Sequence, residues 1–132
     1  PVQNRIEKLP FMDWRQLPAV IAGLDINLMP LENSLFHWCK SENKWTEAAL
    51  VKVPSVMSRN CEMEYVVENG KDGWMCTTKE EWVNALEALV TDEKARKAMG
   101  EAAHQKVMEH YLTVNTGKDA MEELLCSESY TK

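Results

Sequence analysis

One stretch, residues 24–56, limits the folds open to this chain more than any other. It begins with an almost wholly apolar run, Ile26 to Met29, which is typical of a strand buried in a parallel sheet. A polar loop follows, then a helix for which Ser41 is a plausible N-cap, then a second apolar strand over Val53–Met57. This order predicts a β-α-β unit whose two strands are parallel neighbours, because such crossovers are almost always right-handed.

A similar unit is predicted just before it. Residues Arg5–Leu9 alternate polar and apolar side chains, as a half-buried strand does, and Pro10 ends the run. Asp13 can cap a helix that Gly23 closes as the residue after its last turn. We therefore expect three parallel strands, near Arg5–Leu9, Ile26–Met29 and Val53–Met57. A strand edge left open near Arg5–Leu9 would promote pairing between chains.

The second half of the chain predicts mainly helices. Cys61–Val67 is compatible with a short helix or a strand, Asn69–Gly73 is a strong turn signal, and Trp74–Cys76 is a plausible short edge strand. Thr78 and Glu81 match a capping box, and helical periodicity continues to Leu125.

The helices expected in that half begin at Thr78, span about Asp92 to Tyr111, and span Gly117 to Leu125. The fold class expected from these elements is α/β: a partial, Rossmann-like, three-layer domain. Its short parallel sheet is flanked by helices, and its C-terminal end is helical.

Composition excludes several functions. The net charge of −6 and the pI near 5.1 argue against a nucleic-acid-binding surface. The four cysteines are widely spaced without a Cys-x-x-Cys pair, which favours reduced cytosolic thiols over a zinc site or a disulfide frame. No apolar run is long enough to span a membrane. We expect no metal, no nucleic acid and no transmembrane segment.

The 132 residues have the length of one domain or of a part of one. The chain starts at Pro1, without an initiator methionine, and an expected strand follows almost at once. We interpret residues 1–132 as a single, truncated domain.

The loop between Pro30 and Ser41 is the first candidate for function. Ligands of open α/β sheets bind at the carboxyl ends of the strands, against the N-terminus of the following helix, and this loop occupies that position. It is long for a connection of its kind and carries Phe36, His37 and Trp38. A lone histidine is weak evidence for a base, and Ser41 or Lys40 alone could be only a cap or a solvated side chain. Lys44 and Glu47 could likewise form only an exposed helical ion pair.

The ordered set of features resembles the C-terminal half of a GT-B glycosyltransferase of the retaining, nucleotide-sugar-dependent kind, glycosyltransferase group 1. The likeness covers nearly the whole chain, and its main residues are Asp25–Leu31, Lys40-Ser41, Lys44, Glu47-Ala48-Ala49, Val53–Val56 and Asn69–Gly73. The family's C-terminal domain normally begins with one or two further strands and a helix, which are absent here.

The resemblance implies a donor-nucleotide site. The family usually carries two glutamates eight positions apart, of which the second holds the donor ribose; Glu47 matches the second, and Cys39 stands at the first. A subgroup with Phe-x-x-x-Lys-Ser is closer, here Phe36 and Lys40-Ser41. Lys40 and the amides at the start of the helix would hold the diphosphate. The implied donor-binding residues are Lys40, Ser41, Glu42, Asn43, Lys44 and Glu47.

The implied reaction moves a sugar from a nucleotide diphosphate sugar to a hydroxyl of a glycan or lipid-linked acceptor, as in polysaccharide biosynthesis. The acceptor and much of the catalytic machinery would lie on a missing N-terminal domain, so we assign no catalytic residue here. This chain alone would bind nucleotide weakly and transfer no sugar. The family works without a metal or other cofactor, and the implied location is cytoplasmic, with peripheral membrane association left open.

Two other interpretations stay open. The chain could be a non-catalytic, nucleotide-binding or regulatory α/β module, which Cys39 and the missing strands favour. It could also belong to a sugar-nucleotide epimerase of the same architecture, although the carboxylate and histidine set expected of an epimerase is not found.

Overall fold

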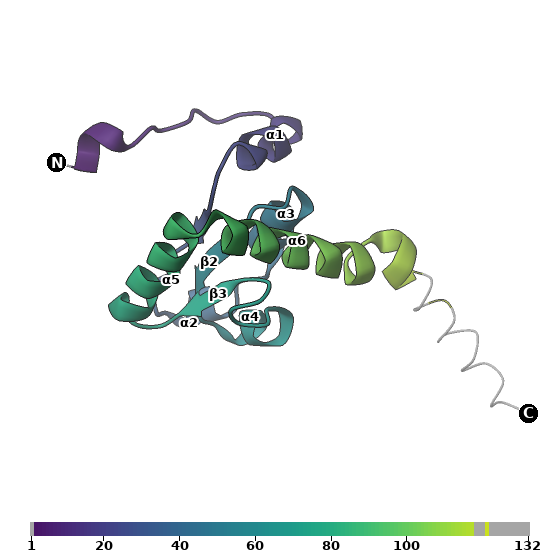
Figure 1. Cartoon of the computed structure of the whole chain (residues 1–132). Helices are drawn as coiled ribbons and strands as arrows, with labels where there is room; N and C mark the ends of the chain where they lie inside the picture. The colour runs from purple at the N-terminus through teal and green to yellow at the C-terminus, as the bar shows by residue number, and fades with distance from the viewer. Residues whose placement is uncertain (1, 118–120, 122–132) are drawn as a thin grey trace, which may run out of the picture.

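A computed structural model describes residues 2–117 and Met121. Its elements, in chain order, are the 3-10 turns η1 (Val2–Arg5) and η2 (Trp14–Gln16), then α1 (Leu17–Ala22), β1 (Asn27–Met29), α2 (Leu35–Trp38), α3 (Asn43–Leu50), β2 (Ser55–Ser58), α4 (Cys61–Val66), β3 (Trp74–Cys76), α5 (Lys79–Thr91) and α6 (Glu93–His110) (Figure 1).

The three strands form one parallel sheet in the order β1-β2-β3. Asn27 pairs with Ser55 and Met57 with Met75, both in parallel register. The parallel pairing predicted for the strands at Ile26–Met29 and Val53–Met57 is therefore confirmed, and Trp74–Cys76 is the edge strand that the sequence indicated.

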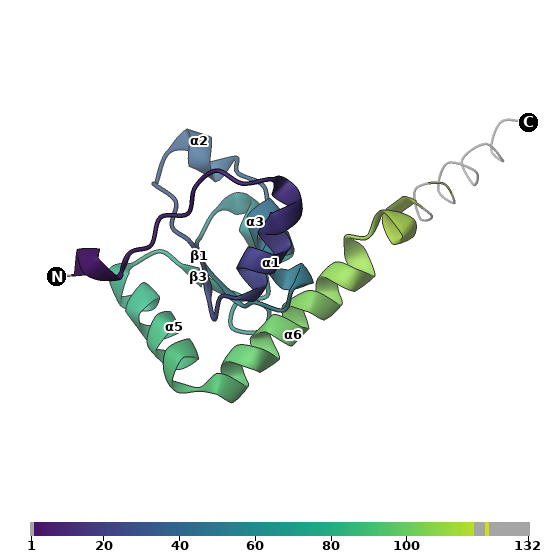
Figure 2. The same ribbon diagram turned by 90° about the horizontal axis from the view of Figure 1, so that it is seen from above.

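Helices cover both faces of this sheet, because side chains alternate along each strand. Met57 points into one buried cluster with Trp45 of α3 and Met63 of α4, whereas Val56 points into a second cluster with Leu89 of α5. Helix α6 contributes to both clusters and packs along α3 and α5. Figure 2 shows α5 and α6 joined at an angle around the sheet. The predicted α/β, three-layer fold with a helical C-terminal end is confirmed.

The strand predicted at Arg5–Leu9 is wrong. This segment is a 3-10 turn followed by irregular chain, and Ile6 and Leu9 are both more than half exposed. A strand exists only where a neighbour satisfies its backbone groups, and the described sheet offers this segment no neighbour. Because this segment is not a strand, it offers no open strand edge for the expected pairing between chains.

The helix signals were mostly read correctly. Asp13 caps η2, Gly23 follows α1, and Thr78 and Glu81 form the capping box of α5. Cys61–Val66 is a helix, because Asn60 caps it by accepting the Met63 N–H at 2.8 Å. The helix expected over Gly117–Leu125 falls almost wholly outside the described residues.

Two side chains at and just after the end of β2 hold the loop that follows β1. The Ser58 hydroxyl accepts the Leu31 N–H at 2.8 Å and donates to the Leu31 carbonyl at 3.2 Å. The buried Asn60 amide donates to the carbonyls of His37 and Lys40 at 3.4 and 3.5 Å. The two ends of the loop are thus fixed to the central strand's carboxyl end, which places the candidate site.

Helix α6 approaches the α3–β2 turn so closely that only glycine fits at position 100. A Cβ there would overlap the backbone carbonyl oxygen of Lys52, a residue that itself has a φ of 62°. The Lys52 ammonium then pairs with Glu101 at 2.8 Å. Backbone contact, rather than side-chain packing, sets this part of the α6 position.

We expect Gly100→Ala to lower the free energy of unfolding by about 1–3 kcal/mol, because the helix must move away from Lys52. Alanine is otherwise favoured over glycine within a helix by about 1 kcal/mol. A net loss of stability in Gly100→Ala would therefore come from the clash with Lys52. Gly117→Ala is the control, since a Cβ there meets nothing within 4 Å. Urea unfolding of the three proteins measures the effect, and equal stabilities for the two variants would contradict it.

A second variant tests the loop anchor. Ser58→Ala removes both hydrogen bonds to Leu31, so we expect hydrogen exchange of the Leu31 amide to become about tenfold faster. Thr77→Ala is the control, because within the described part of the chain that exposed hydroxyl makes no hydrogen bond. Unchanged exchange at Leu31 in Ser58→Ala would mean that the loop does not depend on this anchor.

Candidate functional site

The candidate site lies where β1 ends and α3 begins. The chain leaves Met29, forms the short helix α2, and enters α3 at Asn43. Helix α2 was not predicted; Ser34 caps it by accepting the His37 N–H at 3.4 Å. The available signal was Ser34 before the run Leu35–Trp38, a run that we had expected to be part of a polar loop.

His37 is part of this turn and not a free base. Its Nδ1 lies 2.8 Å from the Ser34 hydroxyl, and its ring meets the Phe36 ring edge-on at 5.3 Å between centroids. Trp38 donates its indole N–H to Asn33 at 2.7 Å, and Cys61 donates its thiol to the Trp38 carbonyl at 2.9 Å. The loop is therefore an ordered platform built by local hydrogen bonds.

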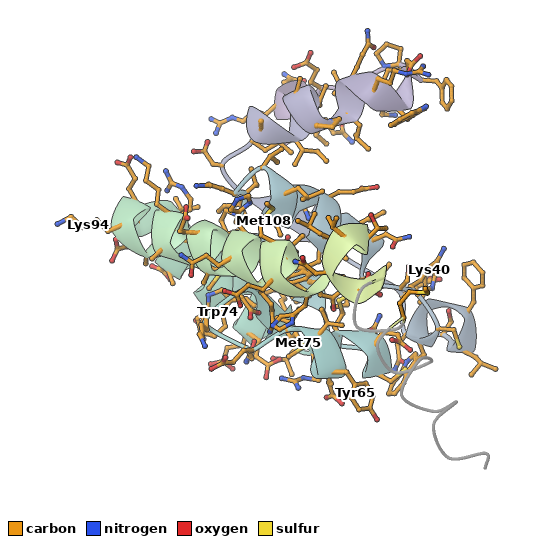
Figure 3. All side chains as sticks on the ribbon, turned by 90° about the vertical axis from the view of Figure 1, so that its right-hand side faces the viewer. Lys40, Tyr65, Trp74, Met75, Lys94 and Met108 are labelled. Carbon is orange, nitrogen blue, oxygen red and sulfur yellow. The ribbon has the colours of Figure 1, made fainter. Side chains whose placement is uncertain are left out.

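Lys40 stands at the end of this platform. Its ammonium lies 4.4 Å from the centre of the Phe36 ring, a cation–π distance. Figure 3 shows Lys40 at the end of the molecule opposite Lys94, which lies in the first turn of α6. Lys40 and Phe36 are both exposed, so the contact orients the cation without removing it from solvent.

Ser41 is not the cap of α3, which corrects the prediction. The helix begins at Asn43, Glu42 occupies the cap position, and no side chain caps this end. Among the described residues, the N–H groups of Asn43, Lys44 and Trp45 therefore have no side-chain acceptor. An uncapped helix start presents such groups, with the positive end of the helix dipole, to an incoming anion.

Lys44 and Glu47 both lie on the exposed side of α3, as expected. Trp45, Ala48 and Ala49 form its buried side. The alternative of an ion pair between Lys44 and Glu47 is not borne out, because neither side chain is in an ion pair within the described part of the chain.

Asn27 ties the first turn of α3 to the sheet, and sequence reasoning missed it. Its side-chain amide donates to the Lys44 carbonyl at 3.3 Å and to the Ser55 hydroxyl at 2.9 Å. The signal was a polar residue inside an apolar strand, because a half-buried amide needs partners. Asn60 and Ser58 act in the same way on the loop and were also missed.

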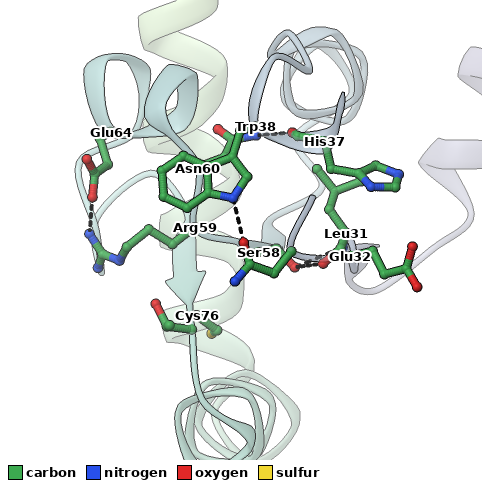
Figure 4. Close-up of a pocket in the computed structure, with 11 residues that line it drawn as sticks. Leu31, Glu32, His37, Trp38, Ser58, Arg59, Asn60, Glu64 and Cys76 are labelled. Carbon is green, nitrogen blue, oxygen red and sulfur yellow. Dashed lines mark hydrogen bonds and ion pairs between the residues drawn. The ribbon is translucent and has the colours of Figure 1, made fainter. Parts of the chain in front are cut away.

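A hollow of about 220 Å³, which we call the loop hollow, opens at the same edge of the sheet (Figure 4). It lies between the loop and the segments that follow β2 and β3. Its walls include Asn33, Trp38, Arg59, Glu64, Cys76 and Thr77. None of the six predicted donor-binding residues lines it, so the loop separates two distinct surfaces.

The charged side chains of the loop hollow are exposed, whereas one of the thiols near it is buried. Arg59 pairs with Glu64 at 3.0 Å, and both side chains remain about half exposed. Burial raises the pKa of the Cys76 thiol, and the nearby Glu81 carboxylate raises it further. Cys76 is therefore a packing residue that stays protonated at neutral pH, whereas Cys39 and Cys61 are exposed thiols.

Within the residues that the structure describes, no three His, Cys, Asp or Glu side chains converge as a metal site would need. The expectation that no metal takes part stays a prediction. In the same part of the chain, no helix has both the length and the apolar character to cross a bilayer.

Two solved structures have the same fold. HepE from Anabaena, crystallised in complex with UDP and glucose, is 18% identical, with a TM-score of 0.68 over 82% of this chain and 29% of that one. The C-terminal domain of a glycosyl transferase group 1 family protein (LpcC) from Francisella tularensis is 18% identical, with a TM-score of 0.59 over 78% of this chain and 52% of that one. The chain thus spans less than a third of the first solved chain and about half of the second. No curated protein matches.

The sequence match alone identifies the family. A family model described as "Glycosyl transferases group 1" matches residues 2–92, more than half of the chain. The matched range holds the sheet, the loop and α3, and the likeness to the two solved structures agrees in fold with the GT-B C-terminal domain. The chain belongs to the group 1 glycosyl transferases.

Proposed function

We propose that this chain forms the donor-nucleotide wall of a retaining glycosyltransferase. The reaction moves a sugar from a nucleotide diphosphate sugar to a hydroxyl of a glycan or lipid-linked acceptor, and a second domain supplies the opposite wall. The observation that carries the proposal is the uncapped start of α3 at the carboxyl edge of a parallel sheet, with Lys40 in the segment before it and Glu47 in the second turn of the helix.

The diphosphate is the part of the donor that this end of α3 suits. Lys40 supplies a cation, and the N–H groups of Asn43 and Lys44 supply directed donors that no side chain of the described residues occupies. Ser41 and Glu42 complete the segment; Ser41 is exposed, and its hydroxyl can donate to a phosphate oxygen because it is not used as a cap. In this proposal Lys40 and the helix dipole, and not a metal ion, stabilise the leaving diphosphate.

Glu47 is assigned to the ribose of the donor. It is exposed and, within the described residues, forms no ion pair, so its two carboxylate oxygens can accept from the vicinal hydroxyls. HepE, whose structure contains UDP and glucose, supports a nucleotide-sugar ligand for this architecture. The base and the transferred sugar are not assigned, and a cytoplasmic role in polysaccharide biosynthesis belongs to the same proposal.

One observation favours a second candidate, a non-catalytic nucleotide-binding module. Cys39, an exposed thiol, stands where the family's first glutamate is usual. Nucleotide binding with full retention of the fold, but without sugar transfer by the full-length protein, would support this candidate over the enzyme.

The test of the donor site is Glu47→Ala, with Glu47→Gln as the conservative variant. Each charge-assisted hydrogen bond contributes about 1.5–3 kcal/mol, so Glu47→Ala should weaken donor binding by roughly one to several orders of magnitude. Glu47→Gln should weaken it less, since an amide oxygen still accepts. Donor Kd by calorimetry, and donor KM and kcat in the full-length enzyme, measure the effect.

Glu87→Ala is the matched control, because Glu87 is an exposed helical glutamate on α5, and α5 packs on the opposite face of the sheet from α3. It should leave donor binding unchanged. Equal donor affinity in Glu47→Ala and in Glu87→Ala, with both variants folded, would remove Glu47 from the site.

A further inference from the structure

The loop hollow is separate from the donor segment, and its wall chemistry points to a ligand of its own. One side is the indole ring of Trp38, which is 47% exposed although its N–H is fixed on Asn33. The lining also includes the Arg59–Glu64 pair (Figure 4). A flat apolar ring and paired hydrogen-bonding groups in one lining suit a ligand ring that is apolar on one side and hydroxylated at its edge.

The volume restricts the ligand to one small ring. About 220 Å³ corresponds to the volume of roughly seven water molecules and is below the range of drug-sized sites. A nucleoside diphosphate has three parts in sequence and would extend well beyond this space. A single pyranose ring has the right scale.

The charge of the wall excludes a phosphate as the preferred ligand. Arg59 is the one Lys or Arg residue of the lining, which also includes the two acidic residues Glu32 and Glu64. Arg59 already lies 3.0 Å from Glu64, so an added anion would meet a net negative wall. A neutral polyol avoids this repulsion, because hydroxyl groups donate to the carboxylates and accept from the guanidinium.

Unused hydrogen-bonding capacity is also present. Among the described residues, the Arg59 guanidinium uses one nitrogen, on Glu64, and the Asn33 side chain uses only its oxygen, on Trp38. The remaining N–H groups of Arg59 and Asn33, with the carboxylate of Glu32, have no partner in that part of the chain. A sugar ring on Trp38 would present hydroxyls to groups of this kind.

We propose that the loop hollow is a saccharide subsite that stacks one neutral sugar ring on Trp38 and holds its hydroxyls with Arg59, Glu64 and Asn33. The saccharide chemistry rests on the hollow alone, and the use of such a site by a sugar-transferring enzyme rests on the proposed function. Asn60 joins this surface to the donor segment, since its amide lines the hollow and donates to the Lys40 carbonyl.

The experiment is an NMR titration that follows the indole N–H signals of the 132-residue chain. The probes are methyl glycosides of glucose, galactose, mannose and N-acetylglucosamine, with maltose and cellobiose. Trp38→Phe assigns the Trp38 signal. We expect at least one probe to shift the Trp38 signal with a Kd on the order of 1–10 mM. The signal of Trp45, which is 0% exposed, should stay in place.

Variants separate a specific site from weak stacking. Arg59→Gln should weaken the affinity for the sugar that binds by at least about fivefold. Lys71→Gln is the matched control, because it removes an exposed ion pair, Lys71–Glu68, in the turn before β3. The sugar affinity of Lys71→Gln should equal that of the unmodified chain.

Three results would overturn the subsite: no shift of Trp38 with any probe, a shift that Arg59→Gln leaves unchanged, or a shift of Trp38 with UDP and not with sugars. UDP binding at α3 is read from the backbone amides of residues 41–44 in the same spectra. Failure of the saccharide subsite is therefore distinguishable from failure of the donor site.

Discussion

One buried residue, Asp72, holds several parts of this structure in register. The Asp72 side chain is 3% exposed, and at such depth an unpaired charge would cost several kcal/mol. The carboxylate is paired with the Lys106 ammonium at 2.6 Å and accepts the Glu68 N–H at 2.8 Å. The backbone carbonyl of Asp72 accepts the Trp45 indole N–H at 2.9 Å. Helices α3 and α6 are thereby tied to the turn before β3, and a shift of either one breaks a buried polar contact.

The candidate site depends on this frame. Trp45 lies in the first turn of α3, so its hydrogen bond to the Asp72 backbone carbonyl also fixes the helix end to which Lys40 leads. Asn27 fixes that turn to the strands from the other side, and Asn60 fixes the Lys40 carbonyl. The positions of an exposed lysine and of a row of backbone N–H groups are thus determined by amide and indole hydrogen bonds within the protein. This arrangement reduces the entropy lost on binding an anion.

Local patterns predicted most of the fold, and long-range contacts explain the rest. The apolar strand runs and the Thr78 capping box are patterns of neighbouring residues, so the sheet and α5 could be predicted. The burial expected of the first run was too complete, because Leu28 is 50% exposed. Arg5–Leu9 has a strand pattern, but a strand also needs a paired neighbour, which no local pattern reports. Ser41 is not the cap because α3 begins at Asn43, so that Glu42 holds the cap position. The roles of Asn27 and Asn60 depend on partners at least 17 residues away, so only the folded chain reveals them.

The central claim is that a nucleotide diphosphate binds at the start of α3. The most direct measurement is a titration of the chain with UDP, GDP and dTDP, followed by the backbone amide signals in proton–nitrogen correlation spectra. The account predicts that at least one nucleotide shifts the amides of residues 41–44 most strongly, with saturation that weakens as salt is added. Shifts that concentrate elsewhere, or no saturable shift at these four amides with any of the three nucleotides, would contradict it.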